Sequence, residues 1–122
     1  MGIAIKRVYE APAEGDGYRV LIDRLWPRGL KKEAVAMDVW ARELAPSTEL
    51  RKWFGHDPAL WDEFRQRYAA ELADSADVWQ ALAQRSAKEP VTLLYGARDE
   101  AHNDAVALKA LMEQWLRRHK PR

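Results

Sequence analysis

The chain has 122 residues, with 20 basic and 19 acidic side chains, a net charge of +1 and no cysteine. The lack of cysteine excludes disulfides, thiolate metal sites and cysteine nucleophiles, and the near-balanced charge gives no general argument for binding nucleic acid or a membrane surface. No apolar run approaches a membrane span, and the N-terminus carries no signal-peptide hydrophobic stretch. We therefore expect one cytoplasmic domain over residues 1–122.

The N-terminal third predicts short strands separated by turns. Residues 3–9 predict a first strand, and residues 11–17 contain proline, aspartate and glycine, which indicate a turn. Residues 18–25 predict a second strand, which could return as a hairpin partner of the first. Residues 31–36 predict a short helical turn, and residues 38–44 weakly favour a strand.

Helical signals dominate the middle of the chain. Ser47 offers an N-cap and Gly55 an end for one helix. Asp57 followed by proline marks the start of a second helix, and Ser75 is the expected cap of a third. The second helix carries an apolar stripe at helical spacing, made of Trp61, Phe64, Tyr68 and Leu72.

A strand and a helix end the chain. The apolar run 91–95 predicts a buried strand that Gly96 ends, and Asp99 is the expected cap of the last helix. Residues 20–22 form a second continuous apolar run, so the two should be adjacent, parallel strands. The predicted fold is α/β: a single small domain with a short, mainly parallel sheet covered by helices and a C-terminal strand–helix unit.

The segment 23–29, Asp-Arg-Leu-Trp-Pro-Arg-Gly, follows the buried run 20–22 directly. Charged groups at the exit of a central strand are costly to desolvate unless they are paired or used. The carboxyl ends of parallel strands meet at one edge of a sheet, where ligands bind in open α/β folds. Two strand ends would then supply one site, with Arg24, Trp26 and Arg28 from the first and Tyr95, Arg98, Asp99, His102 and Asn103 from the second.

These residue types suit a small anionic ligand bearing phosphate or carboxylate, such as a nucleotide. Arg24 and Arg28 would hold the anion, Trp26 and Tyr95 would pack a ring, and free N–H groups at the start of the last helix would assist. The candidates for any catalytic role are Asp23, Asp99 and His102.

Each of these residues also has a structural interpretation. Asp23 could form a buried ion pair with Arg24 or Arg28 that braces the loop. Trp26 could be loop packing, and Asp99 could be only a helix cap. Trp53, Trp61, Trp79 and Trp115 lie on helical apolar stripes and should be mostly buried, and Trp26 should be the exception, partly exposed beside the charged loop.

A second functional hypothesis is an interaction module that associates with nucleic acid. It would use the basic loop 28–32 and the tail residues Arg117, Arg118, Lys120 and Arg122. His56, His102 and His119 lack metal-ligand spacing, and no phosphate-binding glycine loop is present. We therefore expect neither a metal nor a cofactor.

Several motifs together resemble the YeaO-like branch of the family called domain of unknown function 488. They are Gly17-Tyr18-Arg19, the segment 23–29 with Lys31-Lys32, Pro46-Ser47 before Glu49-Leu50-Arg51-Lys52, Phe64 with Tyr68, Glu71 and Leu72, and Thr92-Leu93-Leu94-Tyr95 with Asn103, Ala105 and Leu108.

The resemblance covers nearly the whole chain and implies a small, single-domain, soluble bacterial or archaeal protein. It supplies no activity and no established catalytic residues. Some wider relatives resemble proteins that carry a Cys-His-Arg run after the last strand. This chain has Gly96-Ala97-Arg98-Asp99 there, so the resemblance implies no thiol chemistry.

Overall fold

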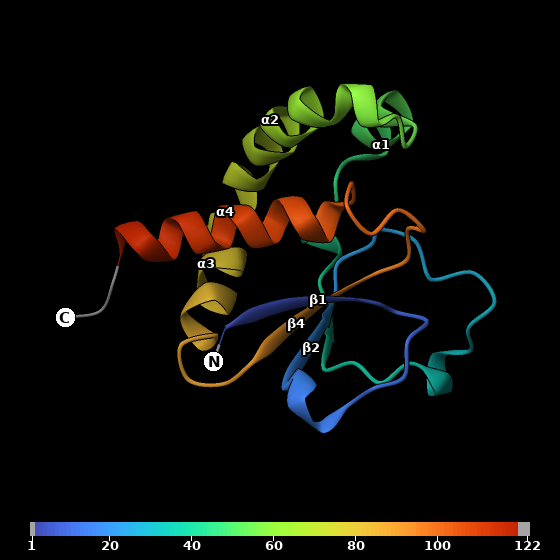
Figure 1. The fold of residues 1–122 in the computed structure, drawn as a ribbon, viewed down its shortest axis with the longest axis vertical. Helices are drawn as coiled ribbons and strands as arrows, with labels where there is room; N and C mark the ends of the chain where they lie inside the picture. Colours follow the sequence, from blue (N-terminus) through green and yellow to red (C-terminus); the bar gives the residue numbers. More distant parts are fainter. Residues whose placement is uncertain (1, 120–122) are drawn as a thin grey trace.

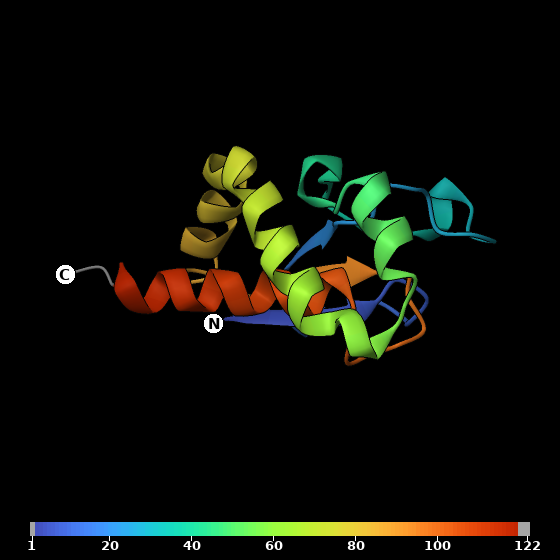
Figure 2. The same cartoon turned by 90° about the horizontal axis from the view of Figure 1, so that it is seen from above.

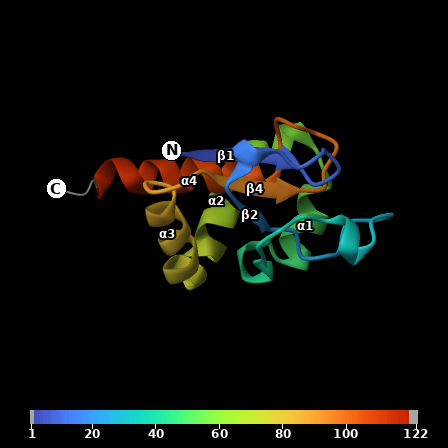
Figure 3. The same ribbon diagram turned by 90° about the horizontal axis from the view of Figure 1, so that it is seen from below.

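The sheet of the computed structural model, which describes residues 2–119, has four strands in the order β1-β4-β2-β3. The strands are β1 (Ile3–Arg7), β2 (Tyr18–Leu21), β3 (Val39–Trp40) and β4 (Val91–Tyr95). Every pairing is parallel, and Figure 3 shows β1, β4 and β2 side by side. The α/β fold and the adjacent, buried β2 and β4 are confirmed.

The hairpin expected between the first two strands is wrong. β4 lies between β1 and β2, and Val91 is in register with Ile3 on one side and Tyr18 on the other. β4 is buried along its whole length, so it gains most from the central position, where both of its edges are hydrogen-bonded. The connection 8–17 therefore leads back along the sheet instead of closing a tight turn.

Four helices complete the fold, namely α1 (Thr48–Phe54), α2 (Trp61–Leu72), α3 (Ala76–Arg85) and α4 (Asp104–Arg118), as Figure 1 shows. The expected start of α1 is confirmed, since Ser47 Oγ accepts a hydrogen bond from the Leu50 N–H at 3.1 Å.

The C-cap of α1 and the beginning of the next helical segment also agree with the sequence. Gly55 ends α1 in the left-handed conformation, with φ of 56°. The Asp57 side chain accepts a hydrogen bond from the Ala59 N–H at 3.0 Å, and a 3-10 turn (Pro58–Leu60) leads into α2.

Two other helix caps differ from the prediction. Asp99 does not cap α4: Asn103 does, with its side-chain oxygen accepting from the Val106 N–H at 3.0 Å. Asp99 instead accepts the N–H groups of Ala101 and His102 in a turn before the helix. Aspartate and asparagine both suit N-caps, so the sequence alone did not separate them.

Ser75 precedes α3 without capping it, because its hydroxyl donates to the Glu43 carbonyl oxygen instead. The expected strand over 38–44 is limited to β3, after which Arg42–Leu44 forms a 3-10 turn. The expected helical turn over 31–36 is confirmed as a 3-10 turn at Lys32–Ala34.

The main core lies between one face of the sheet and all four helices (Figure 2). Val20, Val91 and Leu93 supply this face from β2 and β4, because alternate residues of a strand point the same way. Helix α4 crosses the sheet with a fully buried stripe that includes Leu108 and Met112. A smaller apolar cluster on the opposite face packs under the segment 26–40.

The rest of that opposite face carries a buried ionic cluster. Asp16 accepts a hydrogen bond from Lys6 Nζ at 2.8 Å and another from the Arg19 guanidinium. The Ala13 N–H donates to the same carboxylate at 3.0 Å. Burial opposes ionisation of Asp16, but the hydrogen bond from Lys6, the Ala13 N–H and the two cations outweigh it and hold its pKa below the ordinary value of 3.8.

The expectation for the tryptophans is wrong in part. Trp79 is buried, but Trp53, Trp61 and Trp115 are only partly buried, so Trp26 is no exception among them. The Trp26 indole N–H donates to the Leu30 carbonyl oxygen at 2.7 Å, and its ring packs edge-on against Trp40. In a chain this small a helix surface can leave part of an indole uncovered, as it does for these three side chains.

We predict that Asp16→Ala lowers the free energy of unfolding by about 3–5 kcal/mol at pH 7, because it leaves Arg19 buried without its carboxylate. Chemical denaturation measures the loss. Because the native pKa is lowered, the carboxylate's contribution is complete above the unfolded value of 3.8 and fades as the pH falls through the native pKa.

The matched control is Asp62→Ala, whose carboxylate is paired with Arg65 on the surface and is 83% exposed. That change should cost less than about 1 kcal/mol. Equal losses of unfolding free energy in the two variants would contradict the structural role given to the buried cluster.

Candidate functional site

A pocket of about 670 Å³ opens at the carboxyl ends of β2 and β4, the edge at which the sequence predicted a site. Residues of the loop after β2, the loop after β4, helix α1 and the start of α4 line it. These segments lie at the same end of the molecule in Figure 1. Its volume lies within the range of small-molecule sites. Of the nine predicted site residues and catalytic candidates, eight line it: Asp23, Arg24, Trp26, Arg28, Arg98, Asp99, His102 and Asn103.

Asp23 joins the two strand ends at this pocket. Its Oδ2 accepts a hydrogen bond from the Gly96 N–H at 2.7 Å, so the second residue after β2 is tied to the first residue after β4. A Cβ at position 96 would lie 2.9 Å from the same oxygen, which explains the glycine. The expected brace between Asp23 and Arg24 or Arg28 is wrong, because neither forms an ion pair with it in the described chain, residues 2–119.

The partner of Asp23 is a second carboxyl group, Asp104, at the first position of α4. The two side chains are hydrogen-bonded to each other, and both line the pocket. Asp104 Oδ1 also accepts the Ala105 N–H at 2.9 Å. Two carboxyl groups in contact cannot both ionise cheaply, so such a pair holds a proton.

Burial raises the pKa of both groups, and for Asp104 the adjacent Asp23 raises it further. The shift is the larger for Asp104, whose pKa lies well above the ordinary value of 3.8. For Asp23, the hydrogen bonds that its carboxyl group makes and the charge of Arg51 on α1 limit the rise of the pKa. Burial and mutual repulsion therefore favour a proton on this carboxyl pair, which lies in an open pocket.

Arginines are the other distinctive component of the lining. Four of them surround the pocket: Arg24, Arg28, Arg51 and Arg98. Within residues 2–119, no carboxylate lies within 4.0 Å of any of these four guanidiniums. Arg24 Nε donates to the Pro46 carbonyl oxygen at 3.3 Å, which orients its side chain without neutralising it. All four are solvent-exposed and available to an anion.

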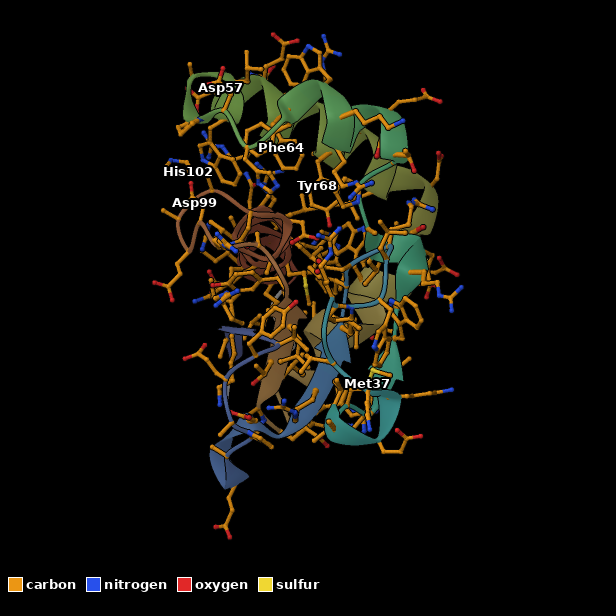
Figure 4. All side chains as sticks on the ribbon, turned by 90° about the vertical axis from the view of Figure 1, so that its right-hand side faces the viewer. Met37, Asp57, Phe64, Tyr68, Asp99 and His102 are labelled. Carbon is orange, nitrogen blue, oxygen red and sulfur yellow. The ribbon has the colours of Figure 1, made fainter. Side chains whose placement is uncertain are left out.

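The loop before α4 supplies an imidazole. His102 Nδ1 lies 3.0 Å from Asp99 Oδ2, and Figure 4 shows the two side chains next to each other. The His102 ring packs edge-on against Trp61 of α2. The backbone hydrogen bonds to Ala101 and His102, together with the His102 side chain, lower the pKa of Asp99. Asp99 therefore remains a carboxylate that orients the imidazole.

Two of the N–H groups expected to be free at the start of the last helix are already used. The Ala105 N–H donates to Asp104 and the Val106 N–H to Asn103. Asn103 is itself buried, and its amide donates to the Asp99 carbonyl oxygen at 2.9 Å. Asn103 therefore caps the helix and shapes the pocket wall, so anion binding would depend on the arginines.

The ring-packing role expected for Tyr95 is not supported by its position. Tyr95 is 2% exposed, belongs to the main core and does not line the pocket. It occupies the last position of β4 on the face covered by helices, so the alternation of the strand turns it away from solvent. The aromatic and imidazole rings that do line the pocket are Tyr9, Trp26, Phe54, His56, Phe64 and His102.

Sequence reasoning missed three functional candidates, Arg51, His56 and Asp104. Arg51 and His56 come from α1 and the turn after it, which no strand-end argument connects to the sheet. The sequence did contain a signal for Asp104, because this residue is next to Asn103, which was already a candidate site residue. Within residues 2–119 no group of three or more metal-ligating side chains is present, and no described helix is long and apolar enough to cross a membrane.

The chain is similar to known proteins over nearly its whole length. Residues 2–122 match a family described as "Inactive DUF488-N3 subclade". The chain is 46% identical over 117 residues to "Uncharacterized protein YeaO" of Escherichia coli strain K12, covering 96% of this chain and 98% of that one. It is 41% identical over 112 residues to "Uncharacterized protein Rv3073c" of Mycobacterium tuberculosis, covering 90% and 92%. No solved structure matches.

The protein is thus a parallel α/β domain with a pocket at the strand ends. The chain belongs to the DUF488 family, in the YeaO-like branch. The resemblance inferred from the motifs is confirmed.

We predict that Asp104→Asn raises the melting temperature at pH 7 and leaves it nearly unchanged at pH 3. A native pKa above the unfolded value means that the fold loses stability as the pH rises from 3.8 towards the native pKa. Asparagine can keep the hydrogen bond to Asp23 without an ionisable group.

Thermal unfolding between pH 3 and pH 8 measures this difference. Asp77→Asn, an exposed acid in the first turn of α3, controls for the loss of an acidic residue near a helix N-terminus. A lower melting temperature for Asp104→Asn than for this control at pH 7 would show that the paired carboxyl groups are not mutually destabilising.

Proposed function

We propose that the protein binds a small ligand carrying a phosphate or carboxylate group in the pocket at the ends of β2 and β4. The observation that supports this most strongly is the set of four arginines around the pocket, none with a carboxylate within ion-pairing distance in residues 2–119. Like charges without ion-pair partners repel one another, and an anion relieves that repulsion by accepting bidentate hydrogen bonds.

The aromatic lining supports a ligand with a ring. Trp26, Phe54 and Phe64 contribute apolar surface to the pocket, and Tyr9 and the two histidines add polar edges. A phosphate near the arginines and a ring against these walls fit within about 670 Å³. A nucleotide or another phosphorylated ring compound therefore suits the site.

Binding without catalysis suits the chain better than an enzymatic function. The matching family is described as inactive, and the chain has no cysteine. His102 is oriented by Asp99, but no serine or threonine lines the pocket beside it as a nucleophile. Hydrolysis by water that His102 or a carboxylate activates is the enzymatic alternative, and turnover of a bound phosphate ester would reveal it.

The nucleic-acid hypothesis has less support. Its two basic segments lie at opposite ends of the molecule, with the loop 28–32 beside the pocket and Arg117 and Arg118 at the far end of α4 (Figure 1). They do not form one continuous basic face, which counterion release on a duplex requires. The remaining tail residues, Lys120 and Arg122, lie outside the described residues.

We expect phosphate to raise the melting temperature of the parent protein relative to chloride at equal ionic strength. A ligand at 100 times its Kd stabilises the fold by about 2.7 kcal/mol. Arg28→Gln and Arg51→Gln should each weaken phosphate binding by about tenfold or more, since each removes a charge-assisted hydrogen bond. Neither should cost more than about 1 kcal/mol of stability without phosphate, because neither side chain is in an ion pair.

Arg117→Gln is the matched control, an exposed arginine far from the pocket. This variant should keep the full rise in melting temperature that phosphate causes. If the parent protein shows no phosphate effect, or if all three variants lose it equally, the proposed anion site is wrong.

A further inference from the structure

We propose that Asp23 and Asp104 make the pocket selective for ligands whose anionic group is joined to a hydroxyl-bearing ring, such as the ribose of a nucleoside monophosphate. The inference rests on the proposed function and adds the part of the ligand that lies away from the arginines. It assigns the two carboxyl groups as specificity-determining residues, with no bond broken or formed.

The position of the pair favours recognition of a ligand over a purely structural role. Both carboxyl groups line the pocket, although each is held from behind by a backbone N–H, from Gly96 at 2.7 Å and Ala105 at 2.9 Å. The two carboxyl groups also act on each other's ionisation, so they lie close together. A rigid carboxyl pair of this kind has oxygen lone pairs left over, which can accept hydrogen bonds from a ligand.

The charges around the pair decide which kind of group it would accept. Arg51 faces Asp23 from α1, and Arg24, Arg28 and Arg98 line the same pocket. These cations disfavour a positively charged ligand group, and a second anion would be repelled by the pair itself. A neutral donor remains, and a hydroxyl group is both donor and acceptor, so it can match a carboxylate and a protonated carboxyl side by side.

A sugar ring would bring such hydroxyl groups close to a phosphate. Carboxylates recognise the hydroxyl groups of ribose in dinucleotide sites by the same chemistry. The pocket here combines arginines, a carboxyl pair and aromatic walls within about 670 Å³, the three chemistries that phosphate, ribose and base require. The geometry therefore points to a ligand with all three parts.

The experiment compares three probes at pH 7 by isothermal titration calorimetry: inorganic phosphate, adenosine 5′-monophosphate and its 2′,3′-dideoxy analogue. The parent protein should bind adenosine monophosphate about tenfold more tightly than the dideoxy analogue, the effect of losing a hydrogen bond to a charged group. Asp104→Ala should reduce that ratio below about threefold while keeping the affinity for phosphate within about threefold.

Two further variants make the result specific. Glu100→Gln removes an exposed acid near the pocket that does not line it, and it should keep the full ratio. If Asp104→Ala does not fold, the double variant Asp23→Asn/Asp104→Asn removes the charge of the pair with little change of shape. It should reduce the ratio in the same way.

The outcomes separate the two proposals. If no probe binds, the proposed function and this inference both fail. If phosphate binds but the parent protein does not distinguish the two nucleotides, the anion site stands and the carboxyl pair is not a hydroxyl site. The same conclusion follows if the folded Asp104→Ala or double variant keeps the tenfold ratio.

Discussion

The hydrogen bond from the Gly96 N–H to Asp23 is the contact on which the site depends. Parallel pairing of β2 with β4 sets Leu21 beside Leu94, so the two chains leave the sheet at the same level. Asp23 and Gly96 then meet directly after the strands, and the absence of a Cβ at Gly96 lets the carboxylate reach the backbone. The loops that carry the arginines begin on either side of this contact.

The same contact lowers the stability of the fold at the pocket. Asp23 is held against the start of α4, where Asp104 already occupies the first helical position, and burial of the two carboxyl groups raises both pKa values. In the buried cluster on the opposite face of the sheet the pKa of Asp16 is lowered instead, because Lys6 and Arg19 pair with its carboxylate. The carboxyl pair with raised pKa values thus lies at the pocket, which is where function tolerates instability.

The sequence predicted those parts of the fold that local patterns determine. The apolar runs at 20–22 and 91–95 required buried strands, and their parallel pairing placed eight of the nine predicted candidates around one pocket. The hairpin failed because strand order depends on which strand gains most from the centre, a property of the whole sheet. Arg51 was missed because its role arises from α1 packing against the strand ends, and no spacing in the chain expresses that contact.

The distribution of arginine partners gives the strongest reason to regard the pocket as a ligand site. Arg65, Arg67 and Arg85 each pair with an acid three or four residues away on their own helix or just beyond its end, as solvent-exposed arginines of a helical surface commonly do. The four pocket arginines have Asp23, Asp99 and Asp104 in the same lining, yet those acids bind backbone N–H groups, each other or His102 instead. Arginines left without partners while acids lie nearby support the proposal that the pocket binds an anion that the protein itself does not supply.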